Sequence, residues 1–269
     1  MKSLSRQISA IAFPAIVSNI TTPLLAMIDV AIVGHFGAAA YIGAIAIGSS
    51  MFNMLYWLFG FLRMGSSGIT AQAYGAGDRP AADAQLYRSL LIAIFVGAII
   101  LLCSVPIASL MLPFMDADAQ TAPLARQYFL IAVLGAPATL GTFALSGWLL
   151  GMQDSRTPMW MALLTNIINI ATSRPLVFAF DMRIKGVAIG SAIAQWSGFV
   201  YGLLYAVVHY HPRYPRLKRL LDWREIKRFF SVNTDIFLRT VCLVAVTLWF
   251  TRAGASQGVD ILAANALLL

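Results

Sequence analysis

The chain alternates between long apolar runs and short polar breaks that contain Gly, Pro or Asp. A helix that crosses the hydrocarbon core of a bilayer needs about 20 mostly apolar residues. Seven runs reach this length, and the start of an eighth follows them. The pattern predicts helices over 11–33, 43–72, 89–112, 123–150, 157–180, 186–209 and 229–252, with an incomplete one over 258–269. The expected fold class is an all-α polytopic membrane protein.

Composition supports this class, because apolar residues make up 59% of the chain and charged residues only 11%. Soluble domains carry about 25% charged residues. A disordered chain, a disulfide scaffold and an ordinary soluble enzyme are therefore excluded. The two cysteines, Cys103 and Cys242, lie in apolar runs and are not expected to form a disulfide. No HExxH motif, catalytic triad spacing or phosphate-binding loop occurs, so we expect neither an enzyme nor a cofactor.

The basic residues fall mainly on one side of the predicted helices. Twelve of the 19 Lys and Arg lie on the side of the N-terminus, and four lie on the other side. Cytoplasmic loops carry the excess of positive charge, so the N-terminus is predicted to be cytoplasmic. The net charge of +8 is then no sign of nucleic-acid binding. We expect a multi-pass protein of the bacterial inner (plasma) membrane.

The longest polar stretch, 211–228, holds seven basic residues against Asp222 and Glu225, a net charge of +5. It is predicted to be an amphipathic helix on the lipid surface. An orientation-setting linker is favoured over a lipid sensor. A second apolar series starts after it, so the chain is divided into a six-helix N-terminal transmembrane lobe (1–210), this linker, and an incomplete start of a C-terminal lobe (229–269). Two equal lobes would make a protein of roughly 440 residues.

Asp29 is the single acidic residue inside the first apolar run. A charge in a transmembrane helix costs about 2.5–3.5 kcal/mol on insertion scales, so such residues usually have partners and a function. A site for H⁺ or Na⁺ is one interpretation. A structural hydrogen bond, or a side chain that snorkels to the outer surface, is the other.

Ser173 and Ser191 are predicted to lie at nearly the same depth as Asp29, in the outer half of the bilayer. Asn166, Asn169 and Ser173 are spaced i, i+3 and i+7, so they share one helix face. Oxygen donors from three helices at one depth suit a hard cation or a protonatable carboxyl group. Polar contacts that hold helices together explain the same pattern equally well.

Two prolines and one arginine in the apolar runs remain to be interpreted. Pro14 and Pro23 each remove a backbone hydrogen bond and tend to kink the first helix. A kink beside the lone acid could couple protonation to bending, and a static kink is an equal alternative. For Arg63 a structural role is favoured, with the small residues that follow it allowing close helix approach.

Five stretches together resemble the multidrug and toxic compound extrusion (MATE) transporters, in particular the DinF-like branch: PAIVSNITTPLLAMIDVAIVGHFG, FGFLRMGSSGITAQAYGAG, GAPATLGTFALSGWLLGMQDSRTPM, NIINI and KGVAIGSAIAQ. The resemblance continues in VNTDIFLRT and LAANALLL and so covers the whole chain. It implies a bundle of twelve helices in two lobes. It also implies cation-coupled export of organic, often cationic, amphipathic compounds by alternating access.

The resemblance also assigns roles to single residues. The acid of the first helix falls on Asp29, the Asn of the fifth on Asn169, the hydroxyl of the sixth on Ser191, and the proline linked to bending on Pro14. Ser173 stands where DinF-like members usually carry Asp, and Arg174 follows it. A site with one carboxylate is expected to bind Na⁺ more weakly, yet it suits coupling to a single proton. Arg174 could pair with Asp29 and lock the site.

The leading hypothesis is therefore the N-terminal portion of a DinF-like MATE exporter, inactive alone. Its partners would be small organic substrates, the coupling cation H⁺ or Na⁺ (at Asp29, with no other metal), the lipid bilayer, and a C-terminal lobe if that lobe is encoded separately. One alternative is a lipid-linked oligosaccharide flippase of the same superfamily, disfavoured because only three arginines lie in apolar runs. Another is a non-transporting membrane fragment.

Overall fold

The computed structural model describes residues 39–115 and 118–215 in full, together with 13, 14, 16, 17 and scattered positions from 223 to 242. The chain divides into two compact units, 1–222 and 223–269. The fold described below is that of the first unit. Apart from those scattered positions, the helices predicted over 11–33, 229–252 and 258–269 lie outside the described residues. Asp29 lies there too.

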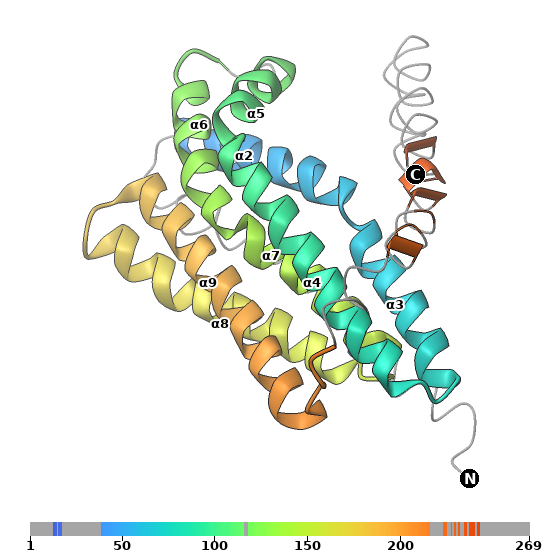
Figure 1. Cartoon of the computed structure of the whole chain (residues 1–269). Coiled ribbons are helices and arrows are strands. Elements are labelled where there is room, and N and C mark those ends of the chain that lie inside the picture. Colours follow the sequence, from blue (N-terminus) through green and yellow to red (C-terminus); the bar gives the residue numbers. More distant parts are fainter. Residues whose placement is uncertain are drawn as a thin grey trace, which may run out of the picture. The chain divides into compact units, whose positions relative to one another are not determined.

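The described part of the first unit is built from helices and contains no strand. Its elements are α2 (Ala39–Leu58), α3 (Phe61–Gly75), α4 (Arg79–Leu102), α5 (Ser104–Met111), η1 (Leu112–Met115), α6 (Thr121–Ala132), η2 (Val133–Gly135), α7 (Ala136–Gly151), α8 (Arg156–Phe178), α9 (Arg183–Tyr205) and η3 (Ala206–Tyr210) (Figure 1). Five stretches are long and apolar enough to cross a membrane: Ala40–Gly75, Arg79–Leu102, Thr121–Gly151, Arg156–Phe178 and Arg183–Tyr210. They correspond to the second to sixth predicted helices, and the all-α membrane fold is confirmed.

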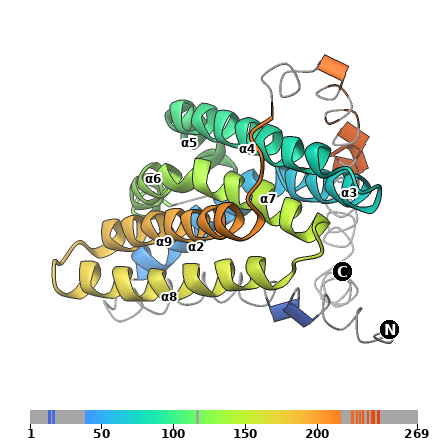
Figure 2. The ribbon, with the colours of Figure 1, turned by 60° about the horizontal axis from the view of Figure 1, so that its bottom comes forward.

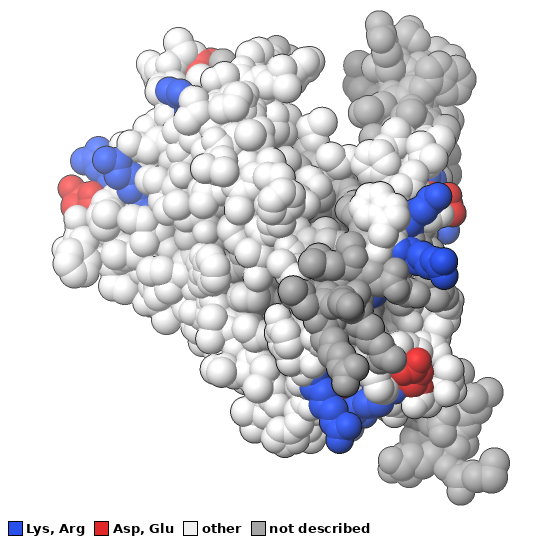
Figure 3. All heavy atoms as spheres, viewed as in Figure 1, with Lys and Arg blue, Asp and Glu red and all other residues white. Residues whose placement is uncertain are grey.

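In helix α4 charged residues are buried and large apolar residues are exposed, as expected for a helix in lipid. Its buried residues include Asp83 and Arg88, whereas Phe95 and Leu102 are 66% and 83% exposed. Across the face in Figure 3 the middle of the first unit shows no charged side chain, and Lys, Arg, Asp and Glu lie toward its ends. A water-soluble protein would expose these charges and bury the large apolar groups. The exposed apolar surface is what a bilayer covers.

The helix predicted over 89–112 is misplaced, because α4 begins ten residues earlier and ends at Leu102. The Asp78 carboxylate caps its first turn by accepting a hydrogen bond from the Ala81 amide at 3.0 Å. The helix breaks at Cys103, and Pro106 follows one turn later without an amide that could bond to the Leu102 carbonyl.

The polar start of α4 resembles a loop in sequence, but tertiary contacts bury it. The indole of Trp148 donates to the Ala82 carbonyl at 2.8 Å. The Asp83 carboxylate accepts the Arg213 amide at 3.0 Å, and the Tyr87 hydroxyl donates to the Pro212 carbonyl at 3.2 Å. The non-helical segment 211–215 therefore lies against α4. The rest of the predicted amphipathic helix, 216–228, lies almost wholly outside the described residues.

The helix predicted over 43–72 is interrupted at Phe59–Gly60, between α2 and α3. Backbone hydrogen bonds tighten there to i→i−3 spacing, with the Leu62 amide bonded to the Phe59 carbonyl at 3.0 Å and the Arg63 amide to the Gly60 carbonyl at 3.1 Å. No proline causes this break. The break at Phe59–Gly60 sets the direction of α3 and therefore the position of Arg63.

Helices α8 and α9 pack closely and lie side by side in both views (Figures 1 and 2). Small residues recur on α9 at every fourth position, namely Gly186, Gly190, Ala194, Gly198 and Gly202. A Cβ atom added at Gly190 would lie 2.9 Å from the Cα of Ser173, and one at Gly186 would lie 3.0 Å from the Leu176 carbonyl carbon. Such stripes let membrane helices approach to backbone contact.

The turn between α7 and α8 is organised by the Asp154 junction, which we define as Asp154 and the groups that donate to it. Asp154 Oδ1 accepts the amides of Arg156 and Thr157, each at 3.0 Å. Asp154 Oδ2 accepts the Thr157 hydroxyl, and it accepts the Tyr210 hydroxyl at 3.2 Å. The carboxylate thereby caps α8 and ties the end of η3 to it.

Candidate functional site: an intramembrane polar cluster beside a cavity

Three polar residues meet between α8 and α9 and are called here the intramembrane cluster: Asn169, Ser173 and Ser191. All three are buried, with Asn169 and Ser173 at 0% exposure and Ser191 at 4%. The Asn169 amide donates from Nδ2 to Ser191 Oγ at 3.0 Å. Ser173 lies one turn further along α8, against Gly190. The structure thus brings together the three cluster residues proposed from the sequence.

Two oxygen atoms of the cluster stand out because they have no hydrogen-bond partner among the described residues. They are Asn169 Oδ1 and Ser173 Oγ, and both are fully buried. Leaving a buried polar group unsatisfied costs about 1–3 kcal/mol, so these oxygens are where a further donor or a cation would be stabilised most. Carbonyl and hydroxyl oxygens are also the donors that hard cations prefer.

The other residues singled out in the sequence fall into three groups. Asn166 lines a neighbouring cavity. Arg174 is exposed and lies outside the buried cluster, although it follows Ser173 directly. Pro14 is buried within helical backbone. Because Asp29 lies outside the described residues, its place beside the cluster and its pairing with Arg174 both stay predictions.

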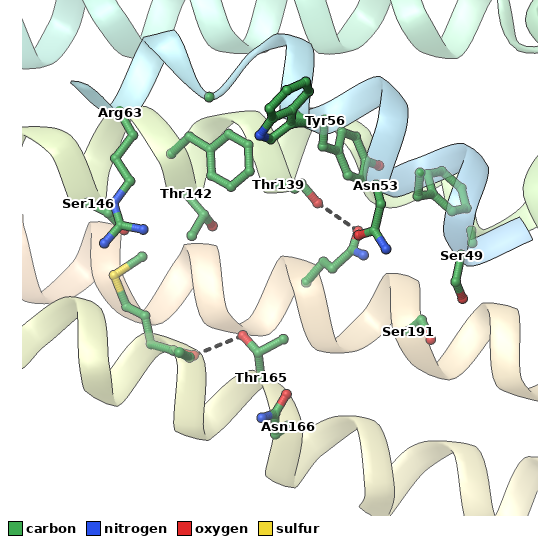
Figure 4. A pocket seen from close by; sticks show the side chains of 18 of the residues that line it. Ser49, Asn53, Tyr56, Arg63, Thr139, Thr142, Ser146, Thr165, Asn166 and Ser191 are labelled. Atoms are coloured by element: carbon green, nitrogen blue, oxygen red, sulfur yellow. Dashed lines mark hydrogen bonds between the residues drawn. The ribbon is translucent and has the colours of Figure 1, made fainter. Parts of the chain in front are cut away.

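A cavity of about 720 Å³ lies next to the cluster, and Ser191 belongs to the walls of both. Figure 4 shows its polar side chains, with Asn53 and Arg63 reaching in from α2 and α3, and Thr165 and Asn166 from α8 on the opposite wall. The Thr139 hydroxyl donates to Gln195 Oε1 at 2.8 Å across the cavity wall. Apolar walls with a few placed polar groups at this size are typical of small-molecule sites.

The sequence interpretation missed the cavity. Asn53, Tyr56 and Gln195 are polar residues in apolar runs, which is a signal, but their convergence depends on how the helices cross. The sequence favours a structural role for Arg63, which stays a prediction, and the structure places Arg63 in the lining of the cavity. The break at Phe59–Gly60 decides this placement, and the apolar pattern does not mark it.

Comparison with known families shows what kind of protein carries this arrangement. The MatE family model matches residues 14–173, more than half of the chain. The chain belongs to the MatE family. Members of this family are transporters and not enzymes, and the polar cluster and the cavity lie in a multi-pass membrane protein of this family.

Two curated relatives support the assignment. The chain is 37% identical to the DNA damage-inducible protein F of Escherichia coli (strain K12) over 261 residues, which are 96% of this chain and 57% of the relative. It is 26% identical to a probable multidrug resistance protein NorM of Thermotoga maritima over 241 residues, 86% of this chain and 50% of the relative. The chain thus spans about half the length of the curated relatives it matches.

A solved structure shows the same fold. The Vibrio cholerae MATE transporter VcmN in the bent form superposes with a TM-score of 0.85 at 18% identity. The match covers 98% of this chain and 60% of that one. The described residues of the first unit therefore have the MATE fold.

Proposed function

We propose that this chain supplies the cation-coupling lobe of an antiporter that exports organic compounds by alternating access, driven by H⁺ or Na⁺. The observation that carries the proposal is the pair of buried, unpartnered oxygens, Asn169 Oδ1 and Ser173 Oγ, beside Ser191. A carboxylate brought to them by Asp29 would complete an oxygen-lined site. Export as such is supported by the relatives, which include multidrug resistance proteins.

In this proposal, coupling depends on a single site at Asp29 for which a proton and Na⁺ compete. When Asp29 is ionised, a proton or Na⁺ neutralises a charge that is costly in the membrane. Asn169 and Ser173 would supply neutral oxygen donors, and Ser191 would hold the Asn169 amide in place. A change in the charge of Asp29 would then alter the stability of the first helix against the cluster, with Pro14 as the point where that helix bends.

The topology proposed with this function has the N-terminus in the cytoplasm, because the basic residues cluster on that side. The membrane is the bacterial inner membrane. The remaining half of the relatives' length would supply the second lobe, and transport is proposed for the two lobes together.

The test measures cation binding to the 269-residue chain in lipid nanodiscs, by the rise in unfolding temperature with NaCl against choline chloride, between pH 5.5 and 8.5. Asp29→Asn is expected to abolish the rise in unfolding temperature with NaCl. If the unfolding temperature responds to pH in place of Na⁺, the same variant should abolish that response. Ser191→Ala should weaken binding several-fold. The matched control is Ser197→Ala, which removes an exposed hydroxyl bonded only to the Ile193 carbonyl within its own helix at 2.8 Å.

Transport provides the second readout. In cells that express the chain as part of a complete two-lobe transporter, Asp29→Asn should abolish gradient-driven ethidium efflux without lowering the amount of folded protein. Unchanged efflux and unchanged cation response in Asp29→Asn would refute coupling through this residue.

A further inference from the structure

The cavity beside the intramembrane cluster carries an uneven charge. Of the described residues that line it, Arg63 alone is charged, and no described lining residue is acidic. Arg63 is half-buried. Figure 4 shows its guanidinium group extending from α3 into the cavity toward Ser146. No ion pair or side-chain hydrogen bond joins that group to any other described residue.

An arginine in this setting has unused capacity. A guanidinium group offers five N–H donors in a planar fork that fits a carboxylate or a sulfonate with two parallel bonds. Removing it from water without a counter-charge is costly, and an anion that enters the cavity would recover that cost.

The walls on either side of Arg63 suit the rest of such a molecule. Aromatic side chains from α2, α6 and α7 line the cavity: Phe52, Tyr56, Trp57, Tyr128 and Phe143. Phe52 and Tyr56 stack with ring centroids 5.4 Å apart, and so form a flat apolar surface. A volume of about 720 Å³ accommodates a drug-sized molecule.

We infer that this lobe binds an anionic amphipathic compound, with its acid group on Arg63 and its ring system on the aromatic wall around Phe52, Tyr56 and Trp57. The inference rests on the proposed export function and gives it a substrate class. Aromatic rings also attract cations, but a cation in this cavity would meet the charge of Arg63. A pyrophosphate-linked lipid would require several cationic side chains, and only one is present among the described lining residues.

The test compares two probes that share a ring system and differ in charge, 1-pyrenebutyrate and (1-pyrenebutyl)trimethylammonium. Binding to the 269-residue chain in nanodiscs of zwitterionic lipid is measured by fluorescence anisotropy, with empty nanodiscs as the blank. The anionic probe should bind about tenfold more tightly or better, because Arg63 can donate charge-assisted hydrogen bonds to its carboxylate and repels the cationic probe.

Variants assign that preference to the arginine. Arg63→Gln should abolish it, and Arg63→Lys should retain part of it. Ser146→Asp, which places a carboxylate beside Arg63 and neutralises its charge, should abolish it in a protein that keeps the arginine. The matched control is Arg126→Gln, which removes an exposed charge outside the cavity. Trp57→Ala should weaken both probes equally, because it removes ring contacts and not charge.

The outcomes separate this inference from the function on which it rests. Equal affinity of the two probes, or a preference unchanged in both Arg63→Gln and Ser146→Asp, overturns the anionic substrate class, while the cation response of Asp29 remains as support for coupling. An anion preference lost with Arg63, in a protein whose Asp29→Asn variant keeps its cation response, supports the cavity assignment and refutes the coupling site.

Discussion

The Asp154 junction and the intramembrane cluster are both buried or half-buried polar sites at α8, and they use their hydrogen-bonding capacity in opposite ways. At the junction both carboxylate oxygens are engaged, by two amides and two hydroxyl groups. In the cluster the Asn169 amide donates to Ser191, and two oxygens, Asn169 Oδ1 and Ser173 Oγ, have no hydrogen-bond partner among the described residues. The first arrangement fixes a turn, and the second leaves hydrogen-bonding capacity unused.

Under the proposed function, the junction contributes stability and the cluster contributes cation binding. A saturated carboxylate at the end of a helix has nothing further to bind, so its removal leaves several donors without an acceptor. The Ser173 hydroxyl is already buried without a partner among the described residues, so its removal costs the fold little. Variants at the two sites should therefore move stability and cation binding in different proportions.

The largest effect is expected from Gly190→Val, which attacks the packing that creates the cluster. The new side chain would collide with the backbone of Ser173, because even a Cβ atom would lie 2.9 Å from its Cα. Overpacking of this kind costs about 3 kcal/mol, and it would also separate Asn169 from Ser191. The cooperative thermal unfolding transition in detergent and the rise in unfolding temperature with NaCl should both be lost.

The control for that variant is Gly68→Ala on α3, where an added Cβ would have nothing within 4 Å. It should leave unfolding temperature and cation response intact or slightly raise the former, since alanine favours a helix by about 1 kcal/mol over glycine. Similar losses in both variants would mean that glycine flexibility, and not close packing, is what matters on α9.

The next effect in size is expected from Asp154→Ala. Removing the carboxylate leaves the amides of Arg156 and Thr157 and the Tyr210 hydroxyl without their acceptor and uncaps α8. A loss of about 2 kcal/mol should lower the unfolding temperature, with no change in cation affinity measured in the folded fraction.

The comparison for this variant is Asp181→Asn, at the turn between α8 and α9, because asparagine tolerates the left-handed backbone that Asp181 adopts (φ 48°). Asp181 pairs with Arg183 at 3.6 Å, but both side chains are more than half exposed. Such a pair contributes little to stability, so the unfolding temperature of the variant should match that of the wild type. An equal fall in both variants would show that any acid at a turn, saturated or not, stabilises the lobe to the same degree.

The smallest change in stability is expected from Ser173→Ala. The Ser173 hydroxyl is buried without a partner among the described residues, so replacing it with a methyl group should change the free energy of unfolding by no more than about 0.5 kcal/mol. Cation binding should nevertheless weaken several-fold, as seen in the Na⁺ titration in nanodiscs. A destabilised protein with unchanged cation affinity would show that Ser173 is a packing residue. The proposed contrast between the cluster and the Asp154 junction would then be wrong.

The cluster could be predicted from the sequence because two regular rules place it. Helix periodicity puts Asn169 and Ser173 on one face, and residue counting from the helix ends puts Ser191 at a matching depth. The cavity could not be predicted, since the position of Arg63 depends on the break at Phe59–Gly60, which no proline marks. The start of α4 was misread for a similar reason. Asp83 and Arg88 are polar, and only contacts from distant segments bury them.

The four-residue spacing of small residues on α9 has a mechanical consequence. Where two backbones touch, no layer of side chains is left to absorb shear, so α8 could slide along α9 only in steps of a whole turn, about 5.4 Å. The two helices therefore travel as one stiff body whenever the lobe changes shape, and the bond between Asn169 and Ser191 travels unbroken with them. Under the proposed function, an ion would then be taken up or released by motion of the element opposite the Asn169–Ser191 pair, while the pair itself keeps its geometry.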